Sequence, residues 1–139
     1  MTFESDKLIG EYWERQVIAK LQPDIYEKED GDFPYWDYTI VKDGQIQRIE
    51  VKSDRMARKT GNVAIEWSCS KRPSGIQKTK AKYWVYVVID TEPEFYKIPV
   101  AVLKDLIHRG EHSDIKTGGD DGMSIMFLFP RHVFSQYKI

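Results

Sequence analysis

The sequence predicts an α/β domain in which three layers, α/β/α, are built around a central mixed β-sheet. Three observations lead to this class: an amphipathic helical segment near the N-terminus, several short alternating strands, and one almost wholly apolar strand. The order of helix, strands, helix and strand is typical of α/β architectures. At 139 residues the chain has the usual size of one domain, so we expect a single domain over residues 1–139.

The first helix is expected over residues 5–21, where Ser5 or Asp6 can cap its start and Pro23 follows its end. Its apolar residues recur at helical spacing and cover a wide arc. They are Leu8, Tyr12, Trp13, Val17, Ile18 and Leu21. Glu14 falls inside this arc, and a carboxylate there is costly unless another group pairs with it.

Alternation and turn residues predict the remaining elements in order. Asp43-Gly44 separates two strands by the residue pair that favours a type I′ hairpin. Pro99 can begin a helix that Gly110 ends. The expected strands are 24–28, 35–42, 45–53, 62–69, 83–90, 94–98 and 124–129; the expected helices are 75–82 and 99–108; segments 71–74, 111–122 and 130–139 are expected to be a turn, a polar loop and a short tail.

The composition indicates a globular chain outside the membrane. It is 41% hydrophobic and 31% charged, without a run of about 18 apolar residues that could span a bilayer. No secretory leader begins the sequence, and the single cysteine, Cys69, cannot form an internal disulfide. We therefore expect no membrane partner and a cytoplasmic location.

The hairpin brings two carboxylates and a lysine to one face of the sheet. If Asp43 and Gly44 are the loop residues, Asp37 directly faces Glu50, with Cβ atoms about 4.5–5.5 Å apart. Lys52 projects from the same face as Glu50, two residues further along the strand. Two carboxylates this close repel each other unless a proton or cation lies between them.

Hard oxygen ligands with open coordination positions suit Mg²⁺, which often binds substrate phosphate as well. A neighbouring lysine can orient a water molecule and stabilise charge on the phosphate. Together these groups are suited to metal-assisted phosphodiester hydrolysis. The alternative is a solvated cross-strand ion network on a surface hairpin.

Charge is distributed unevenly along the chain. Residues 55–82 contain eight basic side chains and one acid, Glu66, so this segment carries +7 and, because the net charge is −1, the rest carries −8. A basic segment on an acidic body suggests a surface for a polyanion, although a solvated lysine-rich loop would have the same composition.

These residues resemble the PD-(D/E)XK nuclease superfamily. Asp37 followed by Glu50-Val51-Lys52 is similar to its Asp…Glu-x-Lys motif, and the segment 10–15, Gly-Glu-Tyr-Trp-Glu-Arg, is similar to the opening of archaeal Holliday-junction resolvases and related phage-type nucleases. The segments 73–76 and 79–84 resemble the stretch after the catalytic strand in phage and bacterial members, and Gly118-Gly119-Asp120 resembles a family loop without assigned chemistry. The resemblance covers residues 8–90. It departs at Trp36, which stands where the family often has proline.

The resemblance implies a restriction-endonuclease-like core and a role for each matching residue. Asp37, Glu50 and the Val51 carbonyl would hold Mg²⁺, with Mn²⁺ as a substitute, while Lys52 positions water and Glu14 supports the metal. Hydrolysis would leave a 5′-phosphate and a 3′-hydroxyl, in a bacterial, archaeal or phage-encoded enzyme. The residues expected to contact the DNA backbone are Arg55, Arg58, Lys71, Arg72, Ser74, Gln77, Lys78 and Lys80.

Other readings remain open at this point. A nucleic-acid-binding module could retain the scaffold without catalysis, and an acidic hairpin could bind a basic protein partner. Within the nuclease reading, the substrate of a junction resolvase, a restriction or homing enzyme or a repair nuclease is not distinguished. One such site cuts one strand, so we expect a homodimer. Zinc is not expected, because Cys69, His108, His112 and His132 lack zinc-site spacing.

Overall fold

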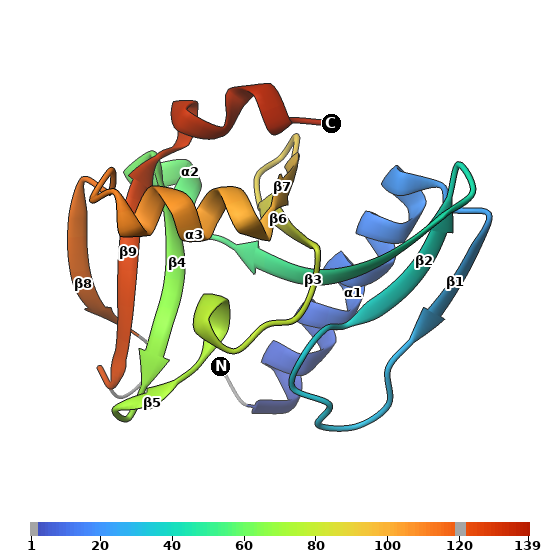
Figure 1. The fold of residues 1–139 in the computed structure, drawn as a ribbon, viewed down its shortest axis with the longest axis horizontal. Helices are drawn as coiled ribbons and strands as arrows, with labels where there is room; N and C mark the ends of the chain where they lie inside the picture. Colours follow the sequence, from blue (N-terminus) through green and yellow to red (C-terminus); the bar gives the residue numbers. More distant parts are fainter. Residues whose placement is uncertain (1–2, 119–121) are drawn as a thin grey trace.

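Residues 3–118 and 122–139 are described by the structure, a computed structural model. They form two β-sheets with helices packed on them (Figure 1). The first sheet has the order β1 (Ile25–Lys28), β2 (Tyr38–Lys42), β3 (Gln45–Asp54), β6 (Tyr83–Val88) and β7 (Glu94–Pro99). The second has the order β5 (Arg72–Pro73), β4 (Asn62–Cys69), β9 (Ser124–Pro130) and β8 (Asp114–Gly118). The helices are α1 (Phe3–Leu21), α2 (Ala57–Thr60), α3 (Val100–His108) and the 3₁₀ turns η1 (Gly75–Gln77) and η2 (Arg131–Tyr137).

The first sheet is mixed, as predicted. Strand β3 runs parallel to β6, and the other neighbouring pairs in this sheet are antiparallel. Strand β6 lies inside the sheet and its residues from Trp84 to Val88 are buried, which explains its apolar sequence. The central mixed sheet of the predicted α/β fold is therefore confirmed.

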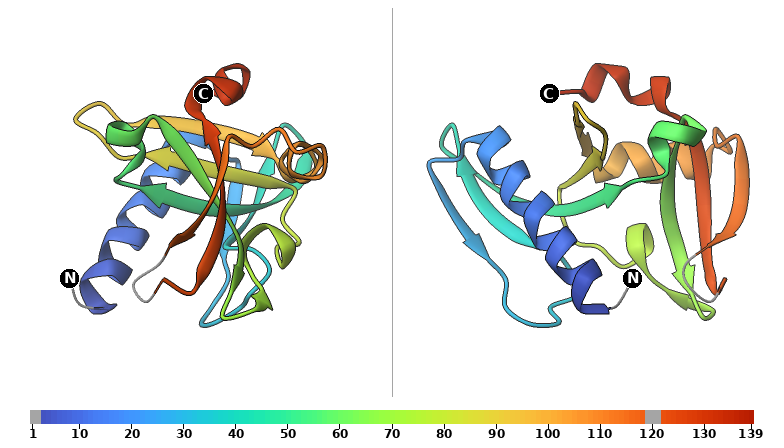
Figure 2. Two further views of the ribbon diagram at one scale, coloured as in Figure 1. Left: turned by 90° about the vertical axis from the view of Figure 1, so that its left-hand side faces the viewer. Right: turned by 180° about the vertical axis from the view of Figure 1, so that it is seen from behind.

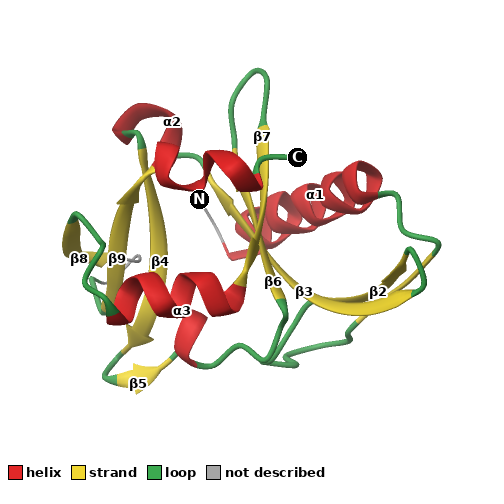
Figure 3. Cartoon of the chain, turned by 45° about the horizontal axis from the view of Figure 1, so that its top comes forward, coloured by secondary structure: helices red, strands yellow, loops and turns green. Residues whose placement is uncertain are grey.

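Each face of this sheet has its own hydrophobic core. Helix α1 covers one face, where Val17 and Leu21 pack against buried residues of β2, β3 and β6. Helix α3 and the second sheet cover the other face, and Leu103 and Phe129 belong to that core. Figure 1 shows α3 in front, whereas the view from behind in Figure 2 shows α1 in front. The second covering layer thus contains a sheet as well as a helix, which the α/β/α expectation did not include (Figure 3).

The β2–β3 hairpin has the predicted turn and register. Asp43 and Gly44 have φ values of 52° and 76°, as a type I′ turn requires. The ladder pairs Lys42 with Gln45 and continues to Tyr38 opposite Ile49. The predicted strand over 35–42 begins later, at Tyr38, because the residues before it leave the ladder.

Three other segments differ from the sequence prediction. The predicted helix 75–82 is only the short turn η1, since the N–H of Lys80 donates to the Tyr35 carbonyl and the chain becomes extended. The predicted loop 111–122 is wrong over Asp114–Gly118, which forms edge strand β8; most of its residues are exposed, so the sequence lacks a buried face. The tail contains η2, anchored by buried Phe134. No helix in the described residues is both long and apolar enough to cross a membrane.

Candidate active site

The candidate site lies where β3 loses β2 on one edge and begins to pair with β6 on the other. Strand β3 pairs with β2 up to Ile49 and with β6 from Ile49 to Asp54. Beyond Ile49, the edge of β3 that faced β2 has no ladder partner in the described residues. The N–H of Val51 on that edge donates to Asp37 Oδ2 at 2.7 Å. A side chain thus replaces the missing strand, and this contact fixes the Asp37 carboxylate beside β3.

Asp37 lies one residue outside β2, so it is not the direct ladder partner of Glu50 that the hairpin register predicted. Its own N–H still donates to the Ile49 carbonyl of β3 at 2.9 Å. The two carboxylates still interact, because the charge of Asp37 adds to burial in raising the pKa of Glu50 to about 7. Burial also raises the pKa of Asp37, although the Val51 N–H, Lys52 and Lys28 oppose the shift.

Lys52 and Thr79 contact opposite oxygens of Glu50. Lys52 Nζ lies 3.7 Å from Oε1, and its ammonium lies over the Trp84 ring, 5.3 Å from the centroid. Thr79 Oγ1 is 3.3 Å from Oε2 and 3.0 Å from the Tyr35 carbonyl, so its hydroxyl proton can be donated to either oxygen. These contacts hold the Glu50 carboxylate in one orientation. Thr79 was not a predicted site residue, since its approach depends on the fold of η1 and not on local spacing.

Glu14 reaches the same region from α1. Its side chain is 17% exposed, and Lys28 Nζ of β1 lies 3.7 Å from Glu14 Oε1. Burial and then Asp37 raise the pKa of Glu14, while Lys28 lowers it. Lys28 therefore supplies the partner that a carboxylate on an apolar helix face requires. The sequence contained no local signal for this pairing, because β1 and α1 meet only in the folded chain.

The predicted backbone contacts occupy three separate places. Arg55 and Arg58 lie beyond the end of β3, near α2, where Arg58 Nη1 is 3.9 Å from Asp90 Oδ1. Lys71 and Arg72 lie at the β4–β5 turn, at the opposite end of β4 in Figure 1. Lys78 and Lys80 follow η1, with Lys80 Nζ 4.3 Å from the centroid of the Tyr35 ring.

The two polar residues of that predicted set are half-buried and contact the protein itself. Gln77 Nε2 donates to the Trp67 carbonyl at 2.7 Å, and Ser74 precedes η1 with its hydroxyl buried. Gly118 ends β8, whereas Gly119 and Asp120 of the predicted loop lie outside the described residues.

The donor set of the site suits a hard divalent cation. Asp37 and Glu50 are buried carboxylates whose raised pKa values reflect an environment that disfavours unpaired negative charge. The N–H of Val51 faces Asp37, and the carbonyl of a strand residue is directed to the same side as its N–H. In residues 3–118 and 122–139 no three His, Cys, Asp or Glu side chains form a ready metal cluster. The fitting set is thus two carboxylates and a carbonyl, leaving positions for water and phosphate.

Comparison with solved structures identifies a protein with a related fold. A scan against protein-family models and a search of curated proteins gave no match. The structure is similar to that of a bacterial homing endonuclease, I-Ssp6803I, with a TM-score of 0.52 and 22% sequence identity. The similarity covers 73% of this chain and 72% of that one. The chain therefore has a mixed α/β fold of the kind found in that endonuclease.

Proposed function

We propose that the chain is a metal-dependent DNA endonuclease of the PD-(D/E)XK type. The observation that carries this proposal is the arrangement of side chains where β2 leaves β3. There Asp37 accepts a hydrogen bond from the Val51 N–H, beside buried Glu50, and Lys52 contacts the Glu50 carboxylate. The fold shared with a homing endonuclease supports DNA as the substrate. The matching residues from Asp37 to Lys52 support the assignment to the superfamily.

In this proposal Asp37, Glu50 and the Val51 carbonyl would hold Mg²⁺ or Mn²⁺. When bound, such an ion polarises the phosphate and lowers the pKa of a coordinated water. Lys52 orients the attacking water and stabilises charge on the phosphate from its place above Trp84. Thr79 keeps Glu50 in position, and Glu14 supports the Asp37 side of the site. The products would be a 5′-phosphate and a 3′-hydroxyl.

A cleavage assay tests the proposal directly. Branched, double-stranded and single-stranded DNA are incubated with wild-type protein, Glu50→Gln and Lys52→Met, in Mg²⁺, Mn²⁺ or EDTA. We expect metal-dependent cleavage by wild-type protein and a loss of about 10²-fold or more in each variant, because each removes a group that acts on the transition state. Comparison of the substrates then tells whether the enzyme acts on branched DNA, as a resolvase does, or on duplex.

Matched controls separate catalysis from folding. Glu27→Gln on β1 and Lys116→Met on β8 change exposed side chains of the same types and should leave cleavage unchanged. If wild-type protein binds DNA but cuts none of the substrates in either metal, the chain is a nucleic-acid-binding module on a nuclease scaffold. If it also fails to bind DNA at low salt, both readings are wrong.

We also propose that the chain acts as a homodimer wherever both strands of a DNA substrate are cut. One set of Asp37, Glu50 and Lys52 cuts one strand, so double-strand cleavage requires two copies. Sedimentation should give twice the 16.3 kDa mass of the chain at concentrations at which both strands of the preferred DNA substrate are cut. A monomeric mass together with nicked products only would contradict this part of the proposal.

A further inference from the structure

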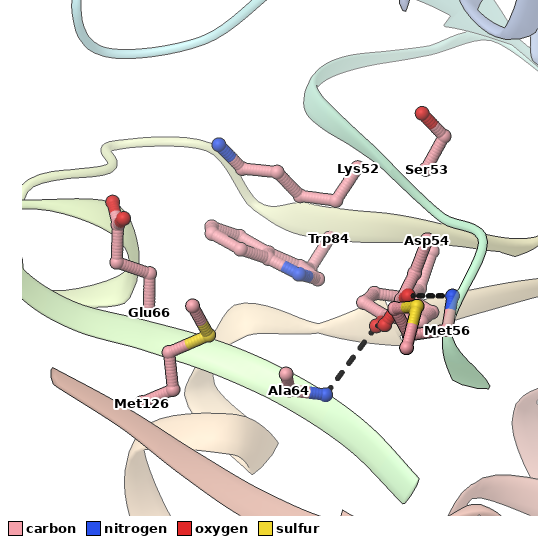
Figure 4. A pocket seen from close by; sticks show the side chains of 9 residues that line it. Lys52, Ser53, Asp54, Met56, Ala64, Glu66, Trp84 and Met126 are labelled. Carbon is pink, nitrogen blue, oxygen red and sulfur yellow. Dashed lines mark hydrogen bonds between the residues drawn. The ribbon is translucent and has the colours of Figure 1, made fainter. Parts of the chain in front are cut away.

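A pocket of about 400 Å³ opens between the two sheets, directly beside Lys52. Lys52 and Asp54 of β3 and Trp84 and Tyr86 of β6 line one side, while Ala64 and Glu66 of β4 and Met126 of β9 line the other (Figure 4). Its volume is within the range of about 300–1,000 Å³ typical of small-molecule sites. Lys52 belongs both to this pocket and to the candidate active site, so a ligand here would adjoin the reacting phosphate.

The pocket has a hydrogen-bond donor without a partner. Trp84 is only 1% exposed, and its Nε1–H has no hydrogen-bond partner in the described part of the chain. A buried N–H without an acceptor is unfavourable, and such groups are uncommon in folded proteins. Figure 4 shows the indole under the Lys52 side chain, with its nitrogen directed along the pocket towards Asp54. An acceptor supplied by a ligand would satisfy this donor.

The neighbouring polar groups of the pocket are already engaged. Asp54 Oδ1 accepts hydrogen bonds from the N–H groups of Met56 and Ala57, at 2.7 and 3.1 Å, and Asp54 Oδ2 accepts one from the Tyr86 hydroxyl. The N–H of Ala64 donates to the same hydroxyl at 3.3 Å. These bonds join β3, α2, β4 and β6 and make the inner end of the pocket rigid.

The walls favour a flat, polar aromatic ring. Met56 and Met126 offer apolar, polarisable surface against which an aromatic ring can pack, whereas Trp84 and Tyr86 are only 1% and 2% exposed. At the other side, Glu66 Oε1 accepts a hydrogen bond from Ser124 Oγ at 3.0 Å, which orients its carboxylate. A nucleobase has ring atoms that can accept a hydrogen bond from an indole N–H, and adenine, cytosine and guanine also carry an amino group that can donate one to a carboxylate.

We propose that this inter-sheet pocket receives one unstacked base of the DNA strand, from a nucleotide next to the phosphate at Lys52. The inference rests on the proposed nuclease function and specifies its substrate class. Removing a base from a duplex costs free energy, and the cost is least where the base is already unpaired or mismatched. The substrate is therefore DNA with unpaired nucleotides, in single strands, branches or mismatches, in preference to uninterrupted duplex.

The indole N–H resonances of the four tryptophans provide the test. Spectra of ¹⁵N-labelled protein are recorded in EDTA, so that DNA is not cut, during titration with short single-stranded oligonucleotides; Trp84→Phe identifies the Trp84 signal. We expect this signal to shift more than those of Trp13 and Trp67, and adenine or cytosine oligomers to bind several-fold more tightly than thymine oligomers. Binding that shifts backbone amides near Lys52 but leaves the Trp84 indole unmoved would overturn the assignment.

A pocket-filling variant gives a second readout. Ala64→Leu adds volume to the pocket wall, so it should weaken single-strand binding about tenfold and reduce the preference over duplex, whereas Ala101→Leu on the exposed side of α3 should not. An unchanged preference in Ala64→Leu, with normal cleavage by wild-type protein, would refute the pocket and leave the nuclease proposal standing. Absence of DNA binding by wild-type protein would refute both.

Discussion

At the residue scale, the three acids of the candidate site are all shifted in the same direction. Burial is the largest cause of the raised pKa of Glu14, Asp37 and Glu50, and Asp37 raises the other two further. Lys28 and Lys52 only partly offset the effect. Folding therefore places three carboxylates in a buried region where their negative charge is unfavourable. Such an arrangement is typical of sites whose function needs a bound cation or a proton.

Glu50→Gln should stabilise the protein at neutral and alkaline pH. The pKa of Glu50 is about 7 in the folded chain against an ordinary value of 4.5, so the folded state binds the extra proton and the free energy of unfolding falls as pH rises through this window. Glutamine is neutral throughout. We expect the variant to match wild type near pH 4.5 and to exceed it by about 3 kcal/mol near pH 8, as measured by urea denaturation in EDTA. Glu27→Gln is the control, and parallel pH curves for Glu50→Gln and wild type would contradict the shift.

Divalent metal should offset most of that difference in stability between Glu50→Gln and wild type. An ion that binds only the folded state at a hundred times its Kd adds about 2.7 kcal/mol to the free energy of unfolding. We expect Mg²⁺ or Mn²⁺ to raise the melting temperature of wild-type protein and to have little effect on Glu50→Gln, which has lost a charged ligand. Equal metal-induced shifts in both proteins would place the ion elsewhere.

At the element scale, the sequence supported the parts of the site that depend on local spacing. Asp43-Gly44 was enough to predict the register of β2 with β3, and alternation then placed Glu50 and Lys52 on one face. The exit of Asp37 from the ladder could not be predicted, because local spacing does not show that β2 leaves one edge of β3 at the point where β6 begins to pair with the other edge.

Contacts between distant elements were likewise beyond sequence reasoning. Thr79 reaches Glu50 only because η1 is short and the following chain pairs with Tyr35. Lys28 meets Glu14 across β1 and α1. Strand β8 was missed because most of its side chains are exposed, so no hydrophobic period marks it.

The first residue of η1, Gly75, lies where a side chain would be both strained and too close to β4. Its φ is +52°, and a Cβ there would lie 2.3 Å from the Glu66 carbonyl oxygen of β4. Gly75→Ala should therefore cost roughly 1–2 kcal/mol for the left-handed backbone and about 1–3 kcal/mol more for the clash. Gly110→Ala has a similar φ of +70° but open space, and should show only the backbone cost. Equal losses in urea denaturation would contradict the close approach. Because Thr79 follows η1, Gly75→Ala should also reduce cleavage.

At the scale of the whole molecule, opposite charges gather on different sides of the site. The groove between the start of α1 and the segment after β1 is lined mainly by acids, which would repel a DNA backbone. They are Asp6, Glu11, Glu14, Glu29, Asp30, Asp32 and Asp37. Basic residues lie instead near η1, α2 and the β4–β5 turn. DNA should thus approach from the side of the second sheet, which is also the side on which the inter-sheet pocket opens.

This distribution of charge predicts that the affinity for DNA depends on salt concentration and that the β4–β5 turn contributes to this dependence. For duplex DNA in EDTA, the logarithm of the binding constant should fall linearly with the logarithm of salt concentration, with a slope of about −0.9 for each neutralised phosphate. Arg72→Ala at the β4–β5 turn should reduce the magnitude of the slope by about one contact, because its side chain is exposed and unopposed by neighbouring acids in the sequence. Arg109→Ala at the end of α3, whose guanidinium bonds Asp105 at 2.9 Å, should leave the slope unchanged. Arg58→Ala should have an intermediate effect, since Asp90 competes for its charge. If Arg72→Ala leaves the slope of the salt dependence unchanged, the DNA strand passes η1 and the inter-sheet pocket without reaching the far end of β4.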